Sequence, residues 1–352
     1  MAGPHVPGQG QVDGARVVST RTAVAVFAVF LGVSSAVVAG PLPPGRTGHF
    51  YVSNFKGDDV VEYDAGGTAV RRLTEGVLDG PRGIVIGRNR IFVAAQNSDT
   101  VVVFDSDRTF LDTFTAPELD GPTGMAFGPG GLLYVCSVEN DSIVAFGPDG
   151  SVVRSFGGRG MKSPTCIATS GSWIYVSGPA SPWIFRFDGN GTLRGTITGG
   201  GLVSPAGLAV YGGRLYVADR GSNRVVILDG KGNLKGEFTH HDLAGPQGLA
   251  FDDRGNLFVT NCYSNSIVQF NRSGHHVRTI HAGKLSFPDG VAFMSRRVGD
   301  IDDDGVVGVA DFSSLIADWG SCPSRPAACS GDITRNGTVD VSDLYILLAN
   351  WD

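Results

Sequence analysis

The sequence is poor in cysteine, in clustered positive charge and in helical periodicity, and each shortage excludes a class of protein. Five cysteines among 352 residues are too few for a disulfide scaffold. The 28 lysines and arginines are not clustered as nucleic-acid binding would require. Residues 48–294 show no apolar spacing of 3.6 residues, which excludes a helical solenoid. Glycine (52) and proline (18) are abundant instead, so we expect an all-β protein with many tight turns.

One long apolar run, residues 23–39, stands near the N-terminus and follows Arg16 and Arg21. The small residues at its end predict that residues 1–39 are a secretory signal peptide, followed by a linker over 40–47. The mature protein would then be secreted, extracellular or on the cell surface, without membrane contact after cleavage. The alternative is an uncleaved membrane anchor, because 17 apolar residues reach the lower limit of a span.

Charge is divided unevenly along the rest of the chain. Residues 299–352 contain 10 acidic and 2 basic residues, whereas residues 40–298 contain 23 acidic and 24 basic residues. The net charge of −6 therefore originates in a small C-terminal module. An acidic solvated tail is the alternative explanation for this segment.

A repeat of 41 or 42 residues sets the architecture of the larger part. A phrase such as GPQGLAF recurs six times, and an aromatic residue opens the next apolar run beside each copy. The prolines are Pro81, Pro122, Pro164, Pro205, Pro246 and Pro288, and the aromatics are Tyr51, Phe92, Tyr134, Tyr175, Tyr216 and Phe258. Each unit holds about four short strands between Gly, Asp and Asn turns, which is the pattern of a propeller blade.

Five of the six copies carry Asp or Asn seven residues after the aromatic. They are Asp58, Asp99, Asp141, Asn223 and Asn265, and Pro182 takes the place in the remaining copy. We expect each of these side chains to close a turn by bonding the backbone two residues on.

The two ends of the repeat region complete one further unit. Pro288 to Phe293 supplies its opening strand, and residues 49–74 supply the three later strands. A ring closed in this way leaves no free sheet edge. We therefore predict a six-bladed β-propeller over residues 48–298. Phrases such as GPQGLAFDDRGNLFVTNCYSNSIVQF resemble NHL-type repeats of six-bladed propellers, a family that includes both binding platforms and enzymes.

The resemblance covers lactonases and lyases that use a metal at the mouth of the central channel. In such enzymes His, Asp, Glu or Asn side chains hold the metal. The residues that follow the recurrent prolines include no histidine, which argues against a zinc lyase of the amidating type: Arg82, Thr123, Thr165, Ala206, Gln247 and Asp289. Arg82 and Asp289 remain candidates at the channel entrance. Asn54, Asp219 and Asn261 share one repeat position, where they either converge on the channel as ligands or cap turns.

The remaining polar and aromatic candidates have plainer interpretations. Five histidines beside the outer strands are expected at the surface: His240, His241, His275, His276 and His281. Trp173 and Trp183 occur in one unit, where they either stack on a sugar ring or, as we expect, pack between blades. The cysteines of the apolar runs, Cys136, Cys166 and Cys262, are expected to be buried thiols.

The C-terminal module contains a twelve-residue loop with the oxygen spacing that calcium requires. Its predicted ligands are Asp300, Asp302, Asp304 and Asp311, with Val306 contributing its carbonyl oxygen. A second copy begins 32 residues later. Its predicted ligands are Asp332, Thr334, Asn336, Asp340 and Asp343, with Thr338 contributing its carbonyl oxygen. We expect calcium as the bound ion and weaker binding in the second loop, because it has fewer carboxylates.

Each loop leads into a short amphipathic helix with apolar residues at helical spacing. The first stripe is Phe312, Leu315, Ile316 and Trp319, and the second is Leu344, Leu347, Leu348 and Trp351. We expect each stripe to cover the other. Between them, Cys322 and Cys329 lie in a turn-rich segment and are the predicted disulfide pair.

The duplicated loop and helix, with Asp at position 12, resemble a type I dockerin module over residues 299–352. The resemblance implies a cohesin-like extracellular partner and calcium-dependent docking, often of proteins that degrade polysaccharides. Family members carry a Ser-Thr type pair at loop positions 10 and 11, where this chain departs with Val309-Ala310 and Val341-Ser342. Our leading interpretation is a secreted binding platform tethered through this module, with a protein or a glycan as its ligand. The alternative is a carbohydrate-active hydrolase, lyase or lactonase with its site in the propeller channel.

Overall fold

The computed structural model describes Met1 and residues 48–351, apart from gaps at 74–75, 88–89, 106–107, 159, 282, 284, 295–298, 300, 302–306, 323–328, 330 and 335. The predicted signal peptide and linker therefore lie outside the described residues. Within the described part of the chain, no helix combines the length and the apolar character needed to cross a membrane.

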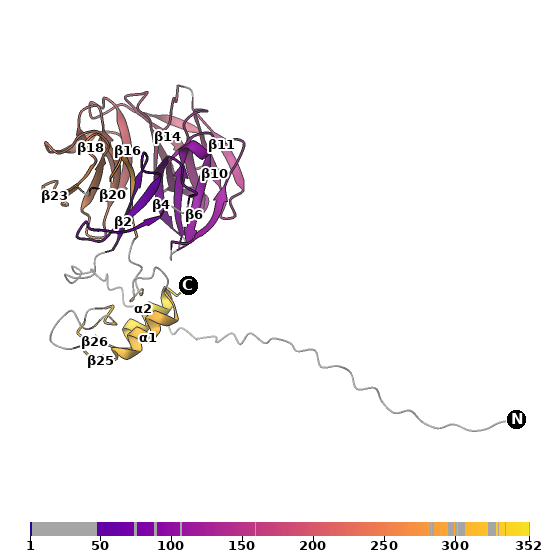
Figure 1. The fold of residues 1–352 in the computed structure, drawn as a ribbon, viewed down its shortest axis with the longest axis vertical. Coiled ribbons are helices and arrows are strands. Elements are labelled where there is room, and N and C mark those ends of the chain that lie inside the picture. Colours follow the sequence, from indigo (N-terminus) through magenta and orange to yellow (C-terminus); the bar gives the residue numbers. More distant parts are fainter. Residues whose placement is uncertain are drawn as a thin grey trace. The chain divides into compact units, whose positions relative to one another are not determined.

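Six four-stranded antiparallel sheets form the blades of a propeller (Figure 1). Blade 1 consists of β24 (Pro288–Phe293), β1 (Phe50–Asn54), β2 (Asp59–Tyr63) and β3 (Ala69–Leu73). Blade 2 consists of β4 (Pro81–Gly87), β5 (Arg90–Ala95), β6 (Thr100–Asp105) and β7 (Phe110–Phe114). Blade 3 consists of β8 (Pro122–Phe127), β9 (Leu133–Ser137), β10 (Ser142–Phe146) and β11 (Val152–Phe156). Blade 4 consists of β12 (Cys166–Ser170), β13 (Trp173–Ser177), β14 (Ile184–Asp188) and β15 (Leu193–Ile197). Blade 5 consists of β16 (Pro205–Tyr211), β17 (Arg214–Asp219), β18 (Arg224–Asp229) and β19 (Leu234–Thr239). Blade 6 consists of β20 (Pro246–Phe251), β21 (Leu257–Asn261), β22 (Ser266–Phe270) and β23 (His276–Ile280). Two short 3-10 helices, η1 (Gln96–Ser98) and η2 (Pro129–Gly131), lie in connections.

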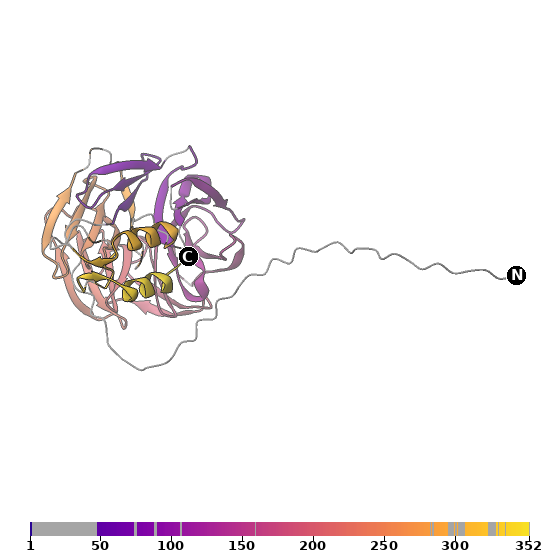
Figure 2. The same cartoon turned by 90° about the horizontal axis from the view of Figure 1, so that it is seen from below.

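The predicted ring closure is confirmed. The last strand of the repeat region, β24, pairs antiparallel with β1, so that Tyr51 lies opposite Ala292 and Phe50 opposite Phe293. Both ends of the repeat region therefore contribute to blade 1, and the six blades surround a common axis (Figure 2). The six blades therefore form a closed ring, in which the inner strand of each sheet is a short edge protected by the neighbouring blades.

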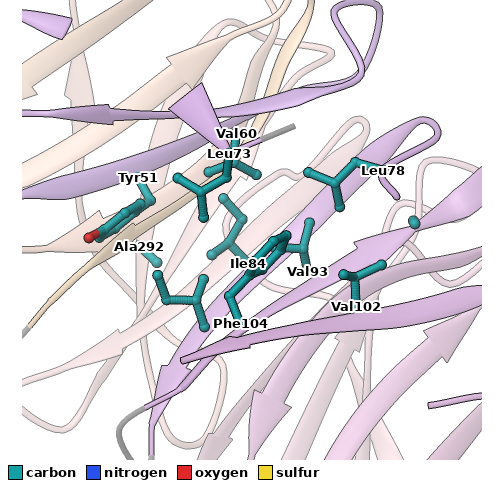
Figure 3. Close-up of a cluster of buried hydrophobic side chains, with 11 residues drawn as sticks. Tyr51, Val60, Leu73, Leu78, Ile84, Val93, Val102, Phe104 and Ala292 are labelled. Atoms are coloured by element: carbon teal, nitrogen blue, oxygen red, sulfur yellow. The ribbon is translucent and has the colours of Figure 1, made fainter. Parts of the chain in front are cut away.

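Each interface between neighbouring blades has its own apolar cluster. Between blades 1 and 2, Tyr51 and Val60 meet Ile84, Val93 and their neighbours (Figure 3). The second and third strands are rich in β-branched and aromatic residues and are buried on both faces, because each blade is covered by the next. The outer strands alternate instead, as β11 does with every second residue exposed. The recurrent aromatics are all buried in the second strands, as their spacing predicted.

The recurrent glycine of the inner strands is required by the approach of the next blade. A Cβ atom on Gly207 would lie 1.9 Å from the carbonyl oxygen of Gln247, and one on Gly83 would lie 2.4 Å from that of Thr123. Cys166 takes the equivalent place in blade 4, where its Sγ accepts a hydrogen bond from the Leu208 amide at 3.2 Å. The inner strands are therefore packed backbone against backbone around the ring.

The Asp or Asn that follows the second strand has a role that differs from our prediction. It is left-handed in all five copies, and its Oδ1 accepts from the backbone amide that precedes the next blade's inner-strand proline. Asp99, for example, accepts from Gly121 at 2.7 Å, 22 residues on. The predicted bond two residues on is wrong, because the entry to the next inner strand folds back over this turn. Each side chain thus ties one blade to the next.

Blade 4 lacks this side chain because Pro182 stands at the position, and a residue of blade 5 takes over. Asp219 is fully buried, and its Oδ1 accepts from the amides of Val203 at 3.0 Å and Ser204 at 2.8 Å. These amides belong to the segment that leads into β16 at Pro205. In the other blades the Asx of the preceding blade binds this segment, whereas here Asp219 of blade 5 itself binds it. The junction between blades 4 and 5 therefore keeps its anchor despite the missing Asx residue.

The C-terminal module contains two helices, α1 (Val309–Ala317) and α2 (Val341–Ala349), and a two-residue strand pair, β25 (Gly320–Ser321) with β26 (Thr338–Val339). Its core consists of Ile301, Val307, Leu315, Val339 and Leu347. The predicted mutual covering of the two helix stripes is found only in part: the rings of Phe312 and Trp351 meet edge to face at 6.5 Å between centres. Leu315 and Leu347 are fully buried, whereas the following stripe residues are exposed: Phe312, Ile316, Trp319, Leu348 and Trp351. The strand pair and the loop residues fill the space that we had assigned to the second stripe.

Candidate functional site

The second predicted calcium loop is curled around its first acidic residue. Asp332 accepts backbone hydrogen bonds from Asn336 at 3.1 Å and from Gly337 at 2.9 Å. Asn336 in turn accepts from the amide of Thr338 at 2.8 Å and from its hydroxyl at 2.7 Å. The side-chain oxygens at positions 1 and 5 are thereby held by amides of the same loop, as in an Asx turn.

Position 12 of the loop is a buried carboxylate. Asp343 is fully buried, and its two oxygens accept from the amides of Thr334 at 2.7 Å and Asp340 at 3.0 Å. Asp340 begins α2 as its N-cap, and its carboxylate accepts from the Ser342 amide at 2.8 Å. Hydrogen bonds from the Ser342 hydroxyl and amide lower the pKa of Asp340, so this carboxylate stays ionised at neutral pH.

The first loop repeats the arrangement at its own position 12. Asp311 is buried, and its two oxygens accept from the Ile301 amide and, at 2.8 Å, from the Gly308 amide. Four predicted ligands of this loop lie outside the described residues: Asp300, Asp302, Asp304 and Val306. The described parts of the two copies thus share a buried carboxylate that bridges the start of the loop and its position 9.

These residues fit a calcium ion by their chemistry. A buried carboxylate is costly unless hydrogen bonds or a cation compensate its charge, and each copy buries one. The second loop supplies carboxylate, amide and hydroxyl oxygens, and hard oxygen donors are what calcium prefers. The residues that would hold the ion there are Asp332, Thr334, Asn336, Thr338, Asp340 and Asp343.

Cys322 and Cys329 form a disulfide next to the second loop. The Cys322 amide donates to the Gly337 carbonyl oxygen at 2.9 Å, and its Sγ lies 3.6 Å from Asp332 Oδ2. The disulfide lies between α1 and the second loop, and Cys322 contacts that loop at Asp332 and Gly337.

In the propeller, the six residues that follow the inner-strand prolines occupy equivalent places around the ring. We call them the mouth ring: Arg82, Thr123, Thr165, Ala206, Gln247 and Asp289. The structure joins two of the predicted candidates, because Arg82 Nη1 lies 2.7 Å from Asp289 Oδ2. Arg82 also donates to Gln96 Oε1 at 2.6 Å, and its guanidinium lies 3.7 Å from the centre of the Phe55 ring. A cation held by a carboxylate and an aromatic face is rigidly oriented.

Two other members of the mouth ring carry buried polar atoms without a partner among the described residues, namely Thr165 Oγ1 and Gln247 Oε1. Gln247 is 9% exposed and adjoins Asp289 in the ring order. A buried acceptor that lacks a hydrogen bond costs free energy, and such groups often await a ligand or water. Sequence reasoning missed both atoms, although their shared repeat position was the available signal.

The three Asx residues at the end of the second strands hydrogen-bond to neighbouring loops. Asn54 donates to Asp59 Oδ1 at 2.7 Å and accepts from the Ser286 amide at 3.3 Å. Asn261 accepts from the Ala244 amide at 3.1 Å, and Asp219 holds the entry to blade 5 as described above. Their side chains hydrogen-bond to the loops that precede the inner strands, which agrees with the alternative that they cap turns.

The thiols of the propeller are poor nucleophiles. Cys136 and Cys262 are buried, as predicted, while Cys166 is half-buried. Burial raises the pKa of Cys166 to about 11 and also raises the pKa of Cys136 and of Cys262. All three are therefore protonated at neutral pH, and the thiolate is the reactive form.

The prediction that the two tryptophans of blade 4 pack between blades is wrong. Trp173 is 36% exposed and Trp183 is 38% exposed. Trp173 opens β13 and is covered by the Arg186 guanidinium at 4.6 Å from its ring centre, whereas Trp183 stands directly before β14. Each stands at the start of its strand, and since β13 and β14 are antiparallel the two lie at opposite ends of the sheet, outside the apolar clusters of blade 4.

Comparison with known proteins agrees with this architecture. The model of the NHL repeat matches residues 202–228 and 243–270, which cover the first three strands of blades 5 and 6. The chain carries NHL repeats. No curated protein matches the sequence.

Solved structures show the same fold at low sequence identity. A nidogen/laminin complex has a chain with 17% identity and a TM-score of 0.60, over 70% of this chain and 97% of that chain. A protein of unknown function from Bacteroides caccae has 15% identity and a TM-score of 0.58, over 70% of this chain and 99% of that one. A catalytically inactive virginiamycin B lyase from Staphylococcus aureus, solved with quinupristin, has 15% identity and a TM-score of 0.55, over 72% and 94%. At these identities the likeness shows the propeller fold alone.

Proposed function

We propose that this protein is an exported NHL-repeat propeller that binds a ligand or protein at its mouth ring and is tethered to an extracellular partner by a calcium-dependent, dockerin-like module. The observation that carries the proposal is the duplicated buried carboxylate at position 12, Asp311 and Asp343. Both carboxylates bridge the two ends of a twelve-residue loop with backbone hydrogen bonds. A calcium ion would neutralise this charge and fix the start of each helix.

The surface of the module supports a docking role. Val309 and Val341 occupy the same loop position in the two copies, and both are more than 70% exposed. Phe312, Trp319 and Trp351 add exposed aromatic surface on the helices. Exposed apolar residues gathered on one small module mark a site for a protein partner. The valines replace the first residue of the polar pair of the family that the module resembles, so we propose a cohesin-like partner with an apolar contact surface.

The mouth ring supports recognition better than catalysis. It has no histidine, and the Arg82–Asp289 ion pair holds its charged groups together. Burial keeps the thiols of Cys166 and Cys262 protonated, so neither supplies a thiolate nucleophile at neutral pH. Oriented donors and unpartnered acceptors around a ring suit a polar ligand such as a glycan or a peptide segment.

A second candidate function rests on the unpartnered oxygens of Thr165 and Gln247 and on the carboxylate of Asp289, which belongs to the blade next to that of Gln247. Such a set would bind and orient a carbohydrate or lactone for hydrolysis or elimination, with Asp289 as the base. Turnover of a lactone or polysaccharide that Asp289→Asn abolishes and Asp149→Asn leaves intact would favour this function. Asp149 lies in an exposed turn of blade 3 and serves as the control.

Capture from an extracellular fraction tests the tethering proposal. The full chain is immobilised in calcium, and its partner is then eluted with a chelator. We expect the partner to be released by the chelator and not captured by the Asp311→Asn/Asp343→Asn double variant, while Asp149→Asn captures it normally. Partner retention that ignores both the chelator and the double variant would refute the calcium dependence.

Mass spectrometry of the exported protein should find Gly40 as its first residue if the signal peptide is cut as proposed.

A further inference from the structure

Three histidines surround one aspartate where the outer strands of blades 5 and 6 meet. His240, His241 and Asp242 directly follow β19, and His276 is the first residue of β23. The ring of His240 lies 4.0 Å from that of His241 and 3.9 Å from that of His276, centre to centre. We expected the three histidines at the surface from the sequence. The fold brings their side chains and that of Asp242 together at one point.

The distances at this point match a metal centre. His241 Nε2 lies 3.2 Å from Asp242 Oδ1, while His240 Nδ1 and His276 Nε2 lie 3.6 Å and 3.7 Å from Asp242 Oδ2. One donor atom each from His240, His241 and Asp242 falls within 4.8 Å of the others. Tetrahedral zinc with bonds of about 2.0 to 2.1 Å holds neighbouring donor atoms about 3.3 Å apart. Rotation of these side chains would bring the donors onto one ion, and His240 Nδ1 would then give up the hydrogen bond that it accepts from the Asp242 amide at 3.2 Å.

The backbone around the cluster is fixed before any ion binds. The Leu243 amide donates to the His240 carbonyl oxygen at 3.1 Å, and Leu243 is buried in the core between blades 5 and 6. The Thr279 hydroxyl donates to Asp242 and lies 2.9 Å from His276 Nε2. The bond to Asp242 orients this ligand, whereas His276 Nε2 would exchange its contact with the Thr279 hydroxyl for the ion.

We propose that His240, His241 and Asp242, with His276 as the fourth ligand, bind one divalent transition-metal ion of the zinc class. Imidazole nitrogens select zinc or a similar ion over calcium, which takes oxygen donors. The site is thus distinct in chemistry and position from the C-terminal loops. Four protein ligands make it a closed, structural site that fastens the segment after β19 to the outer strand of blade 6.

Zinc titration of the full chain, purified without an affinity tag and in excess calcium, tests the proposal. Isothermal titration calorimetry should show one zinc ion per chain, and the midpoint of thermal unfolding should rise with zinc. His241→Gln, Asp242→Asn and His276→Gln should each weaken binding by about tenfold or more. His275→Gln is the matched control, since His275 is exposed one residue from the site, and it should bind zinc as the wild type does.

Two outcomes would overturn the proposal. One is a wild-type chain that takes up no zinc, and the other is zinc binding that all three site variants retain unchanged. The variants are expected to fold, because His241 is exposed and asparagine at 242 keeps an acceptor for Thr279. Unchanged thermal unfolding of each variant in the absence of zinc confirms that any lost binding reflects lost ligands. The buried propeller thiols are protonated and do not compete for the ion.

Discussion

Gly207→Ala tests whether the inner strands close the ring by backbone contact. The new Cβ would lie 1.9 Å from the Gln247 carbonyl oxygen and 3.3 Å from the Gly248 Cα. A carbon and an oxygen in ordinary contact lie about 3.5 Å apart, so β16 and β20 must separate by more than about 1 Å. Gly207 has no left-handed φ that alanine would strain, and the effect is therefore steric.

Overpacking of a core costs about 1 to 3 kcal/mol, and a clash with backbone belongs at the upper end. We therefore expect Gly207→Ala to lower the free energy of unfolding by about 3 kcal/mol, or the unfolding midpoint by roughly 6 to 12 °C. Gly230→Ala is the matched control, because its Cβ meets nothing within 4 Å and its φ is ordinary. Urea and thermal unfolding of both variants measure the difference. A Gly207→Ala protein as stable as Gly230→Ala would refute close packing of the inner strands.

Three further predictions follow from single side chains. Asn223→Ala removes the acceptor of the Gly245 amide, and we expect urea unfolding to show a loss of about 1 to 3 kcal/mol. Burial raises the pKa of Glu62, but hydrogen bonds and charge from His49 and Arg108 lower it overall. The stabilisation by Glu62 is therefore present above its unfolded pKa and is lost as the pH falls below about 4.5. Thermal unfolding of Glu62→Gln should thus lie furthest below the wild type at neutral pH and approach it in acid; a constant gap would contradict the shift. Cys136 is buried, so a thiol reagent should modify it only after unfolding, and rapid labelling of the native protein would contradict its burial.

The repeat spacing was enough to predict the blades and their closure. The recurrent prolines and aromatics fix strand starts at constant intervals, and blade packing depends on the same intervals in every copy. The partners of the Asx side chains were not predictable, since the amide that Asp99 binds lies 22 residues away and reaches it only in the folded ring. The histidine cluster escaped sequence reasoning for the same reason, because His240 and His276 belong to neighbouring blades.

In the C-terminal module, the loop spacing correctly located the helices but overstated how much apolar surface they bury. A module of this size has little interior, and Leu315 and Leu347 with their loop neighbours fill it. Periodicity identifies an apolar face without telling whether it meets a helix of the same chain or a partner. The exposed Trp319 and Trp351 are the part of that face that our docking proposal uses.

Calcium titration calorimetry of the full chain tests the central claim most directly. The account predicts two calcium ions per chain, with tighter binding in the loop that ends at Asp311 than in the loop that ends at Asp343. Asp311→Asn should remove the tighter event, and Asp343→Asn should remove the weaker one. Equal affinities would refute the ranking of the loops. A chain that binds no calcium at about millimolar concentration, the weak end for extracellular modules, would contradict the proposed tether itself.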